Sequence, residues 1–277
     1  MFNYEFMRYA LIAGFLGGVT CSVIGVLVIS MQSSFIGVAV AHAAFAGSII
    51  ALFIGINPLM GALIFSILSA ATIGPISDRG EFSPDTPLGI IFAMMHGLAF
   101  LFMGMMSSSK TQALDLMWGN ALAINEFGLK IIIVAFVLVV GLIILFYKEI
   151  QAVMFNREIA LSVGLPASWI FYGILFLTGI TVAANLQSIG GLLVCTLIIT
   201  PAAAAYQLTY NLKYLFLIAS AFGVFSCWAG LILTYYINLP SGAIIVLISS
   251  MIFLIVNAFS PRKKVKRVKS LKDVSKL

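Results

Sequence analysis

The feature that most constrains this chain is a succession of apolar segments, each about as long as a membrane is thick. A transmembrane α-helix needs about 20 mostly apolar residues, and such segments recur along the sequence. Hydrophobic residues make up 62% of the 277 and charged residues only 9%, whereas a soluble domain averages about 25% charged residues. So few polar side chains cannot cover the core of a soluble protein. The sequence therefore predicts an all-α, polytopic transmembrane helical bundle.

We predict about nine spans, with eight as the alternative. Proline is tolerated in the first turn of a helix, so Pro58 and Pro240 are predicted to begin two of the spans. Residues 1–260 then form a single transmembrane domain, and residues 261–277 form a basic tail. The predicted spans lie near residues 8–30, 35–55, 58–76, 87–106, 130–147, 169–186, 189–209, 213–236 and 240–258.

The distribution of lysine and arginine predicts the orientation in the membrane, because cytoplasmic loops carry an excess of these residues. With the tail in the cytoplasm, twelve of the 15 basic residues fall inside, and only Arg8, Lys110 and Lys130 fall outside. The net charge of +6 comes mostly from the tail. It therefore indicates contact with anionic lipid headgroups, and we expect no nucleic-acid partner.

All nine acidic residues lie in predicted loops or at span ends, so no carboxylate is expected in mid-membrane. An ion-coupled carrier usually needs a buried carboxylate, which argues against an ATPase-independent ion carrier. The sequence also has no G-x-x-x-x-G-K-[ST] pattern for a phosphate-binding loop. We therefore expect a transporter subunit that is not itself an enzyme and whose energy comes from a partner.

The predicted cytoplasmic loop 148–168 contains a short helical signal, NREIALSVG. Asn156 is a good N-cap residue, and the helix dipole favours Glu158 in the first turn. Gly164 can end the helix and Pro166 prevents its continuation. This pattern predicts either an ordinary amphipathic connector or a docking helix for a soluble motor protein.

The same loop carries a resemblance to a known family. Glu158, Ala160 and Gly164 match the E-x-A-x-x-x-G spacing of the coupling helix in ABC importer permeases. The whole chain resembles the ABC-3 permeases of zinc, manganese and iron uptake, because four further segments match theirs in order. These segments are SFIGVAVAHAAFAG (34–47), MWGNALAI (117–124), LQSIGGLLVCTLIITPAAAAYQLT (186–209) and LPSGAIIVL (239–247).

The resemblance implies a permease of the bacterial or archaeal cytoplasmic membrane that imports a divalent transition metal by alternating access, with zinc or manganese favoured over iron. It implies a homodimer of permease copies and separate cytoplasmic ABC ATPase subunits, coupled through Glu158, Ala160 and Gly164. It also implies an extracytoplasmic metal-binding protein that delivers the ion. No cofactor is expected to be bound permanently, since the metal is cargo.

The resemblance also assigns His42 to the metal path. The family usually has an aspartate four residues before this histidine, and here that position is Val38. In the fourth predicted span, His96 and Met95 offer a softer pair of imidazole and thioether ligands. On physical grounds alone, the histidines could equally bond to neighbouring helices and the methionine could fill the core. The alternative prediction is a permease of the same fold for a soft metal or a metal chelate.

Overall fold

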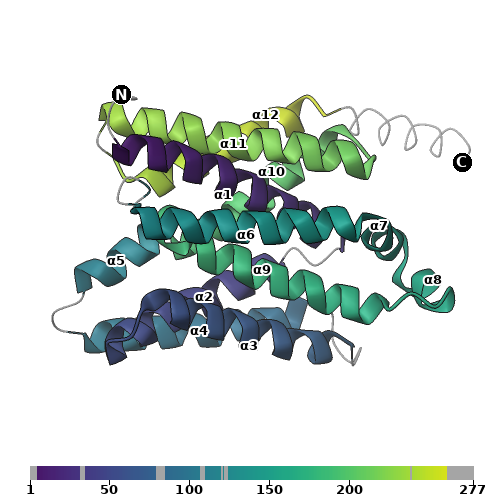
Figure 1. The fold of residues 1–277 in the computed structure, drawn as a ribbon, viewed down its shortest axis with the longest axis horizontal. Coiled ribbons are helices and arrows are strands. Elements are labelled where there is room, and N and C mark those ends of the chain that lie inside the picture. Colours follow the sequence, from purple (N-terminus) through teal and green to yellow (C-terminus); the bar gives the residue numbers. More distant parts are fainter. Residues whose placement is uncertain are drawn as a thin grey trace, which may run out of the picture.

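The computed structural model describes residues 5–31, 35–78, 85–106, 110–119, 121, 124–237 and 239–260. This part of the chain contains twelve α-helices and no β-strand (Figure 1), which confirms the predicted all-α bundle. The predicted tail, 261–277, lies outside the described residues. The helices are α1 (Glu5–Ser30), α2 (Phe35–Ile54), α3 (Pro58–Asp78), α4 (Asp85–Met105), α5 (Lys110–Trp118), α6 (Glu126–Leu145), α7 (Tyr147–Phe155), α8 (Arg157–Ser162), α9 (Ala167–Ile189), α10 (Gly191–Leu208), α11 (Leu212–Ile237) and α12 (Ser241–Ala258).

Each of the nine predicted spans lies on one helix, and most of the predicted ends fall within three residues of the observed ones. Seven of these helices are long and apolar enough to cross a membrane. The other two, α3 and α10, contain shorter apolar stretches, Pro58–Ile73 and Leu193–Leu208. The chain is therefore an integral membrane protein, and its span count of about nine is approximate.

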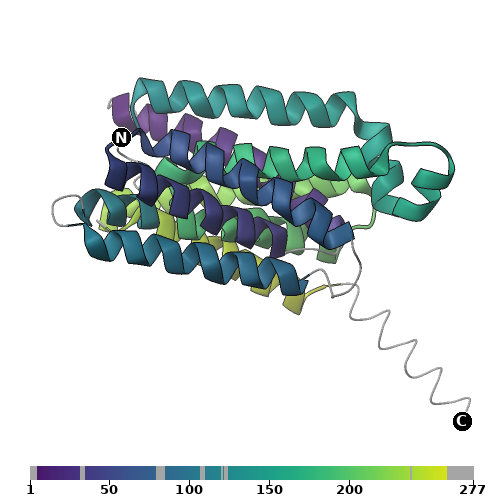
Figure 2. The ribbon, with the colours of Figure 1, turned by 90° about the horizontal axis from the view of Figure 1, so that it is seen from below.

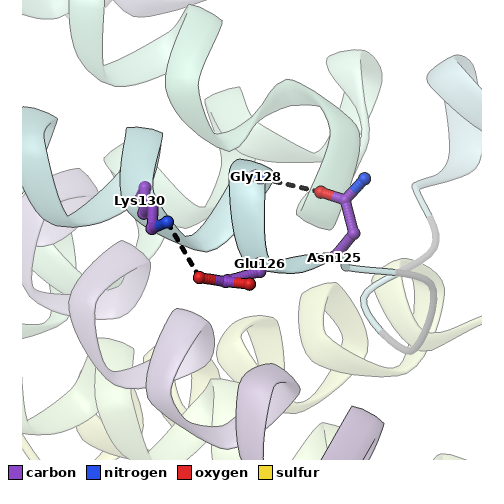
Figure 3. Close-up of polar contacts among 4 residues, drawn as sticks. All are labelled: Asn125, Glu126, Gly128 and Lys130. Carbon is purple, nitrogen blue, oxygen red and sulfur yellow. Dashed lines mark hydrogen bonds and ion pairs between the residues drawn. The ribbon is translucent and has the colours of Figure 1, made fainter.

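Helix α6 begins at Glu126, four residues before the predicted start of the fifth span. The cause is an N-cap (Figure 3), because Oδ1 of Asn125 accepts a 2.8 Å hydrogen bond from the backbone N–H of Gly128. Glu126 and Lys130, which are four residues apart, form a 2.8 Å ion pair along the first turn of α6. Both side chains are exposed, so solvent screens the pair, and the cap sets the helix start.

Three short helices lie at the two ends of the bundle, in segments that hydropathy assigned mostly to loops. Helix α5 is at one end, and α7 follows α6 directly at the other, next to α8 (Figure 1). In α5 the buried residues are Ala113, Leu116 and Met117, which is the spacing of one helical face. A helix of nine residues with one apolar face is too short and too polar to register as a span.

The long helices form two groups joined by α9 and α10. Helix α1 packs against α6, α9, α10 and α11, whereas α2 packs against α3 and α4, and both α9 and α10 contact α1 and α2. Figure 1 shows α1 and α11 on one side of the bundle and α2, α3 and α4 on the other, and in Figure 2, seen from below, α2, α3 and α4 lie in front. The most apolar stretch of α2 is 78% buried and that of α4 only 17%. Helix α2 is therefore an inner helix, while α4 presents most of its surface outwards.

Glycines allow two of these helix pairs to approach at backbone distance. A Cβ on Gly47 of α2 would collide with the backbone of Gly61 in α3, and the reverse is also true. Gly18 of α1 and Gly223 of α11 meet in the same way. Small residues permit this close packing between membrane helices, and it fixes the position of α2 and hence of His42.

Three of the segments that resemble the ABC-3 family meet at the α5 end. Gly119 follows α5, Gly190 joins α9 to α10, and Gly242 lies in the first turn of α12. A Cβ on any of these three glycines would collide with the backbone of another segment. Gly119 and Gly190 have φ values of 75° and 100°, which L-residues with side chains rarely adopt. The hydroxyl of Ser241 also accepts a 3.3 Å hydrogen bond from the Ala121 N–H. This junction ties the short helix α5 to α9, α10 and α12.

Candidate functional site

The packing of α2 on α4 brings the two histidines of the chain together. Their Nδ1 atoms lie 3.0 Å apart, although the residues are 54 positions apart in the sequence. A neutral imidazole has one N–H donor and one acceptor nitrogen, so one histidine donates from Nδ1 and the other accepts at Nδ1. His42 is only 6% exposed and His96 is half-buried. The two predicted site residues thus form one pair inside the apolar bundle.

Phenylalanines of α4 surround the pair. The ring of Phe92 meets His42 edge-on at a centroid distance of 4.5 Å and stacks on His96 at 5.4 Å. Phe100 lies 4.7 Å from the His96 ring. Because Phe92, His96 and Phe100 are spaced by four residues, they share one face of α4. Aromatic faces attract cations weakly, so the rings add some stabilisation for a bound cation without adding a charged ligand.

The spacing of the two Nδ1 atoms is that of a hydrogen bond, and it also lies within the range found for two nitrogens on one metal ion. With metal–nitrogen bonds of about 2.0–2.1 Å, two nitrogens lie about 3.3 Å apart at a tetrahedral angle and about 2.9 Å apart at a right angle. The observed 3.0 Å falls between these values. The distance is therefore compatible with one ion held through both Nδ1 atoms, which would require the shared proton to move to an Nε2 atom.

The pair has no acidic partner in the described residues. Nowhere among them do three or more His, Cys, Asp or Glu side chains lie close enough to hold a metal ion. Val38, one turn before His42, packs against the hydrophobic core, as does Met95. Neighbouring positions on a helix point about 100° apart, so Met95 and His96 differ in direction, and the role of Met95 as a ligand stays a prediction.

The predicted short helix in the cytoplasmic loop is present as α8, and its caps are those expected from the sequence. Oδ1 of Asn156 accepts a 3.1 Å hydrogen bond from the Ile159 N–H, which is N-cap geometry. At the other end Gly164 has φ +86°, its N–H donates to Leu161 O, and the Leu165 N–H donates to Ala160 O. These two bonds make a Schellman motif with Gly164 in the left-handed position.

The three predicted coupling residues have different environments. Ala160 is 3% exposed and packs with Val153 of α7 and Ala167 of α9, so it anchors α8 to its neighbours. Gly164 is exposed, and a Cβ on it would meet nothing within 4 Å. The side chain of Glu158 lies outside the described part of the structure. Within the motif, Ala160 therefore packs α8 against its neighbours, and Gly164 forms the C-terminal end of the helix.

Large apolar side chains are exposed on and beside α8. Four large apolar side chains there are more than half exposed, and together they are a candidate docking patch. The patch consists of Phe155 (86% exposed), Ile159 (54%), Val163 (75%) and Trp169 (79%).

Sequence reasoning missed the role of Arg157, the first residue of α8. Its guanidinium donates a 3.1 Å hydrogen bond to Ser168 Oγ and lies 5.1 Å from the centroid of the Phe171 ring. Both contacts are on α9, so Arg157 ties α8 to the span that follows it. In the sequence, only the basic residue after Asn156 in NREIALSVG could have suggested this role, and a basic residue alone does not identify the side chains that it contacts.

These features define the class of the protein. An all-α bundle of apolar spans, with an imidazole pair among them and a capped helix projecting at one end, is a membrane permease architecture. Residues 3–260 match the ABC 3 transport family, and the chain belongs to this family. The resemblance inferred from its sequence segments is therefore confirmed.

Individual relatives align over almost the full length of the chain. It is 34% identical over 263 residues to the manganese transport system membrane protein MntC of Listeria monocytogenes, covering 95% of this chain and 94% of that protein. It is 27% identical to the chelated iron transport system membrane protein YfeD of Yersinia pestis, over 96% and 89% of the two chains. Among solved structures, PsaBC from Streptococcus pneumoniae in complex with Fab matches with a TM-score of 0.85, 27% identity and 96% coverage of both chains.

Proposed function

We propose that this chain is the permease subunit of an ABC importer that moves a divalent transition-metal ion into the cell by alternating access. Its family membership supports this proposal, as do relatives named for manganese and chelated-iron transport. ATP hydrolysis takes place on a separate subunit, in keeping with a sequence that has no phosphate-binding loop pattern.

The observation that carries the proposal is the 3.0 Å approach of His42 and His96 within the bundle. Polar groups are expensive inside a membrane and are usually functional there. Neutral imidazole is a good ligand for zinc, iron, copper and nickel. We assign this pair to the path of the metal, with Met95 as a third candidate ligand from the same turn of α4.

A second candidate cargo follows from the charge of the site. The pair is neutral, and Val38 occupies the position at which the family usually has a carboxylate. Burying a divalent ion without a negative ligand is costly, and carboxylate oxygens are the ligands that suit manganese. A nitrogen-preferring ion such as zinc, a soft metal or a metal already neutralised by a chelator therefore fits the pair better than bare manganese.

The proposed assembly follows the two ends of the bundle. Two permease copies form a homodimer, and ATPase subunits dock at the α8 end through the apolar patch, with Glu158, Ala160 and Gly164 shaping the contact. That end faces the cytoplasm because it carries the excess of basic residues, and the tail 261–277 follows from it. An extracytoplasmic metal-binding protein docks at the α5 end. Residues 1–260 make up one permease domain, with residues 148–168 as its coupling loop.

The experiment that tests this function measures ATP hydrolysis by the purified permease–ATPase complex in lipid while zinc, manganese and iron are delivered separately. We expect stimulation by at least one transition metal and none by magnesium or calcium beyond the nucleotide requirement. Stimulation by zinc but not by manganese would favour the second candidate cargo, an ion that fits a site without a carboxylate. Metal transport by the permease alone, without an ATPase, would contradict the proposal.

A further inference from the structure

An open pocket lies between α6, α7 and α11, and its lining includes no residue of the imidazole pair or of the docking patch. Figure 1 shows α7 at the same end of the bundle as α8. The rings of Tyr147 and Phe216 bridge α7 and α11 across it, with centroids 6.4 Å apart and an edge-to-face geometry. The pocket has a volume of about 650 Å³ and is lined by Ile144, Leu145, Tyr147, Lys148, Glu149, Lys213 and Phe216. None of these residues belongs to the proposed metal path, and Lys148 and Glu149 are the first two residues of the proposed coupling loop.

The charges around this pocket favour an anion. Lys148 is the second residue of α7 and Lys213 the second residue of α11. The N-terminus of a helix carries a partial positive charge, so neither lysine gains stability from its own helix. In the described part of the chain neither forms an ion pair. Two cations and two helix N-termini therefore converge on a pocket that contains one carboxylate, Glu149.

The pocket also has an apolar wall at a defined depth. Ile144 and Leu145 are the last residues of the α6 span and are 70% and 71% exposed. The lysines follow at the level where the apolar spans end, and a tyrosine lies beside them, as is common at the membrane–water boundary. The pocket thus crosses from the hydrocarbon region to the headgroup region.

We propose that this pocket binds one anionic phospholipid from the leaflet at the α8 end. Its phosphate lies between Lys148 and Lys213, and an acyl chain lies along Ile144 and Leu145. Basic pockets between transmembrane helices bind anionic headgroups in this way. Inorganic phosphate would satisfy the lysines but would leave the apolar wall uncovered. The proposal requires only that the protein spans a membrane, so it is independent of the metal cargo.

The test is native mass spectrometry of the full-length protein from nanodiscs of phosphatidylcholine with increasing phosphatidylglycerol. We expect the wild type to retain one phosphatidylglycerol. Each lysine contributes about 1 kcal/mol, so Lys148→Ala or Lys213→Ala should weaken retention about fivefold and the double variant about 30-fold. Glu149→Gln should strengthen retention, because it removes the like charge.

The matched control is the double variant Arg8→Ala/Lys110→Ala, which removes two exposed basic residues from the opposite end and should retain the lipid. Equal loss in both double variants, or no loss in either, would overturn the proposal. Displacement of the lipid by inorganic phosphate alone would do so too. If the Lys148/Lys213 variant kept the lipid but lost its ATPase during purification, the pocket would be a protein contact instead.

Discussion

The imidazole pair shows what the fold adds to individual residues. Each histidine could be found in the sequence, because a polar side chain in a predicted span needs a reason. Their pairing at 3.0 Å could not be predicted from the sequence. It depends on how α2 packs in the bundle, including the contact of Gly47 in α2 with Gly61 in α3. Val38 was visible only through the resemblance to the ABC-3 family, which implies a carboxylate at this position, and the proposed neutral character of the site depends on it.

The first prediction concerns the ligands. Replacing His96 with alanine removes one of two nitrogens, and even the loss of an outer-shell partner weakens metal binding about 10–100-fold. We expect the zinc affinity of the purified protein to fall by about 100-fold or more in His96→Ala. Leu98→Ala, at a half-buried apolar residue of α4, is the control for packing, and titration with a fluorescent zinc indicator compares it with His96→Ala and with Met95→Ala. A stronger effect of Met95→Ala would transfer the ligand role to the thioether.

The second prediction concerns the missing charge. Val38 and His42 are one turn apart and share a helix face, so Val38→Asp places a carboxylate beside the imidazole pair. We expect the ratio of manganese-stimulated to zinc-stimulated ATP hydrolysis to rise about tenfold, since carboxylate suits manganese better than imidazole does. Val38→Asn has nearly the same shape without the charge and should leave the ratio unchanged. The same rise in both variants would show that charge is not the cause.

At the scale of elements, α8 was the part best predicted from sequence. Its start and end depend on local chemistry, namely an asparagine N-cap and a glycine with φ +86°, and local rules describe such ends well. The anchoring of α8 by Ala160 and Arg157 was not predicted, because both contacts reach α9, and Ala160 also contacts α7.

The third prediction concerns docking on α8. Ile159 is 54% exposed, so Ile159→Ser should leave the fold intact and reduce co-purification of the ATPase at least about fivefold, as expected when an apolar contact of more than 1 kcal/mol is lost. Ile56, which is 55% exposed at the opposite end of the bundle, gives the matched control Ile56→Ser. Quantitative pull-down of the ATPase measures both. Equal yields from the two variants would exclude the patch as the docking surface.

The fourth prediction concerns the packing of α1 on α9. A Cβ on Gly17 would collide with Oδ1 of the buried Asn185, and overpacking typically costs about 1–3 kcal/mol. Gly17→Ala should therefore lower the thermal unfolding temperature in detergent, and adding Asn185→Ala should partly restore it. Gly141→Ala in α6, where a Cβ meets nothing within 4 Å, is the control and should be neutral or stabilising. Additive losses in the double variant would contradict a direct clash.

At the scale of the whole molecule, the length of the apolar segments predicted nine helices and the bundle class, because lipid imposes a minimum span. The short helix α5 and the junction of Gly119, Gly190 and Gly242 were not predicted. Hydropathy does not register a short amphipathic helix, and backbone contacts between three distant segments leave no periodic pattern. The acidic residues in the described helices lie at helix ends or in the short helices α5, α7 and α8, so no carboxylate lies in the middle of a long described helix beside the histidine pair.

The central claim is that an ATP-driven metal path passes His42 and His96. The most direct measurement is uptake of radioactive zinc or manganese into liposomes that contain the permease with its ATPase and metal-binding protein. The account predicts uptake that requires ATP and is lost in His42→Ala/His96→Ala, while that variant still assembles with the ATPase. Undiminished uptake by the assembled double variant, or uptake without the ATPase, would contradict it.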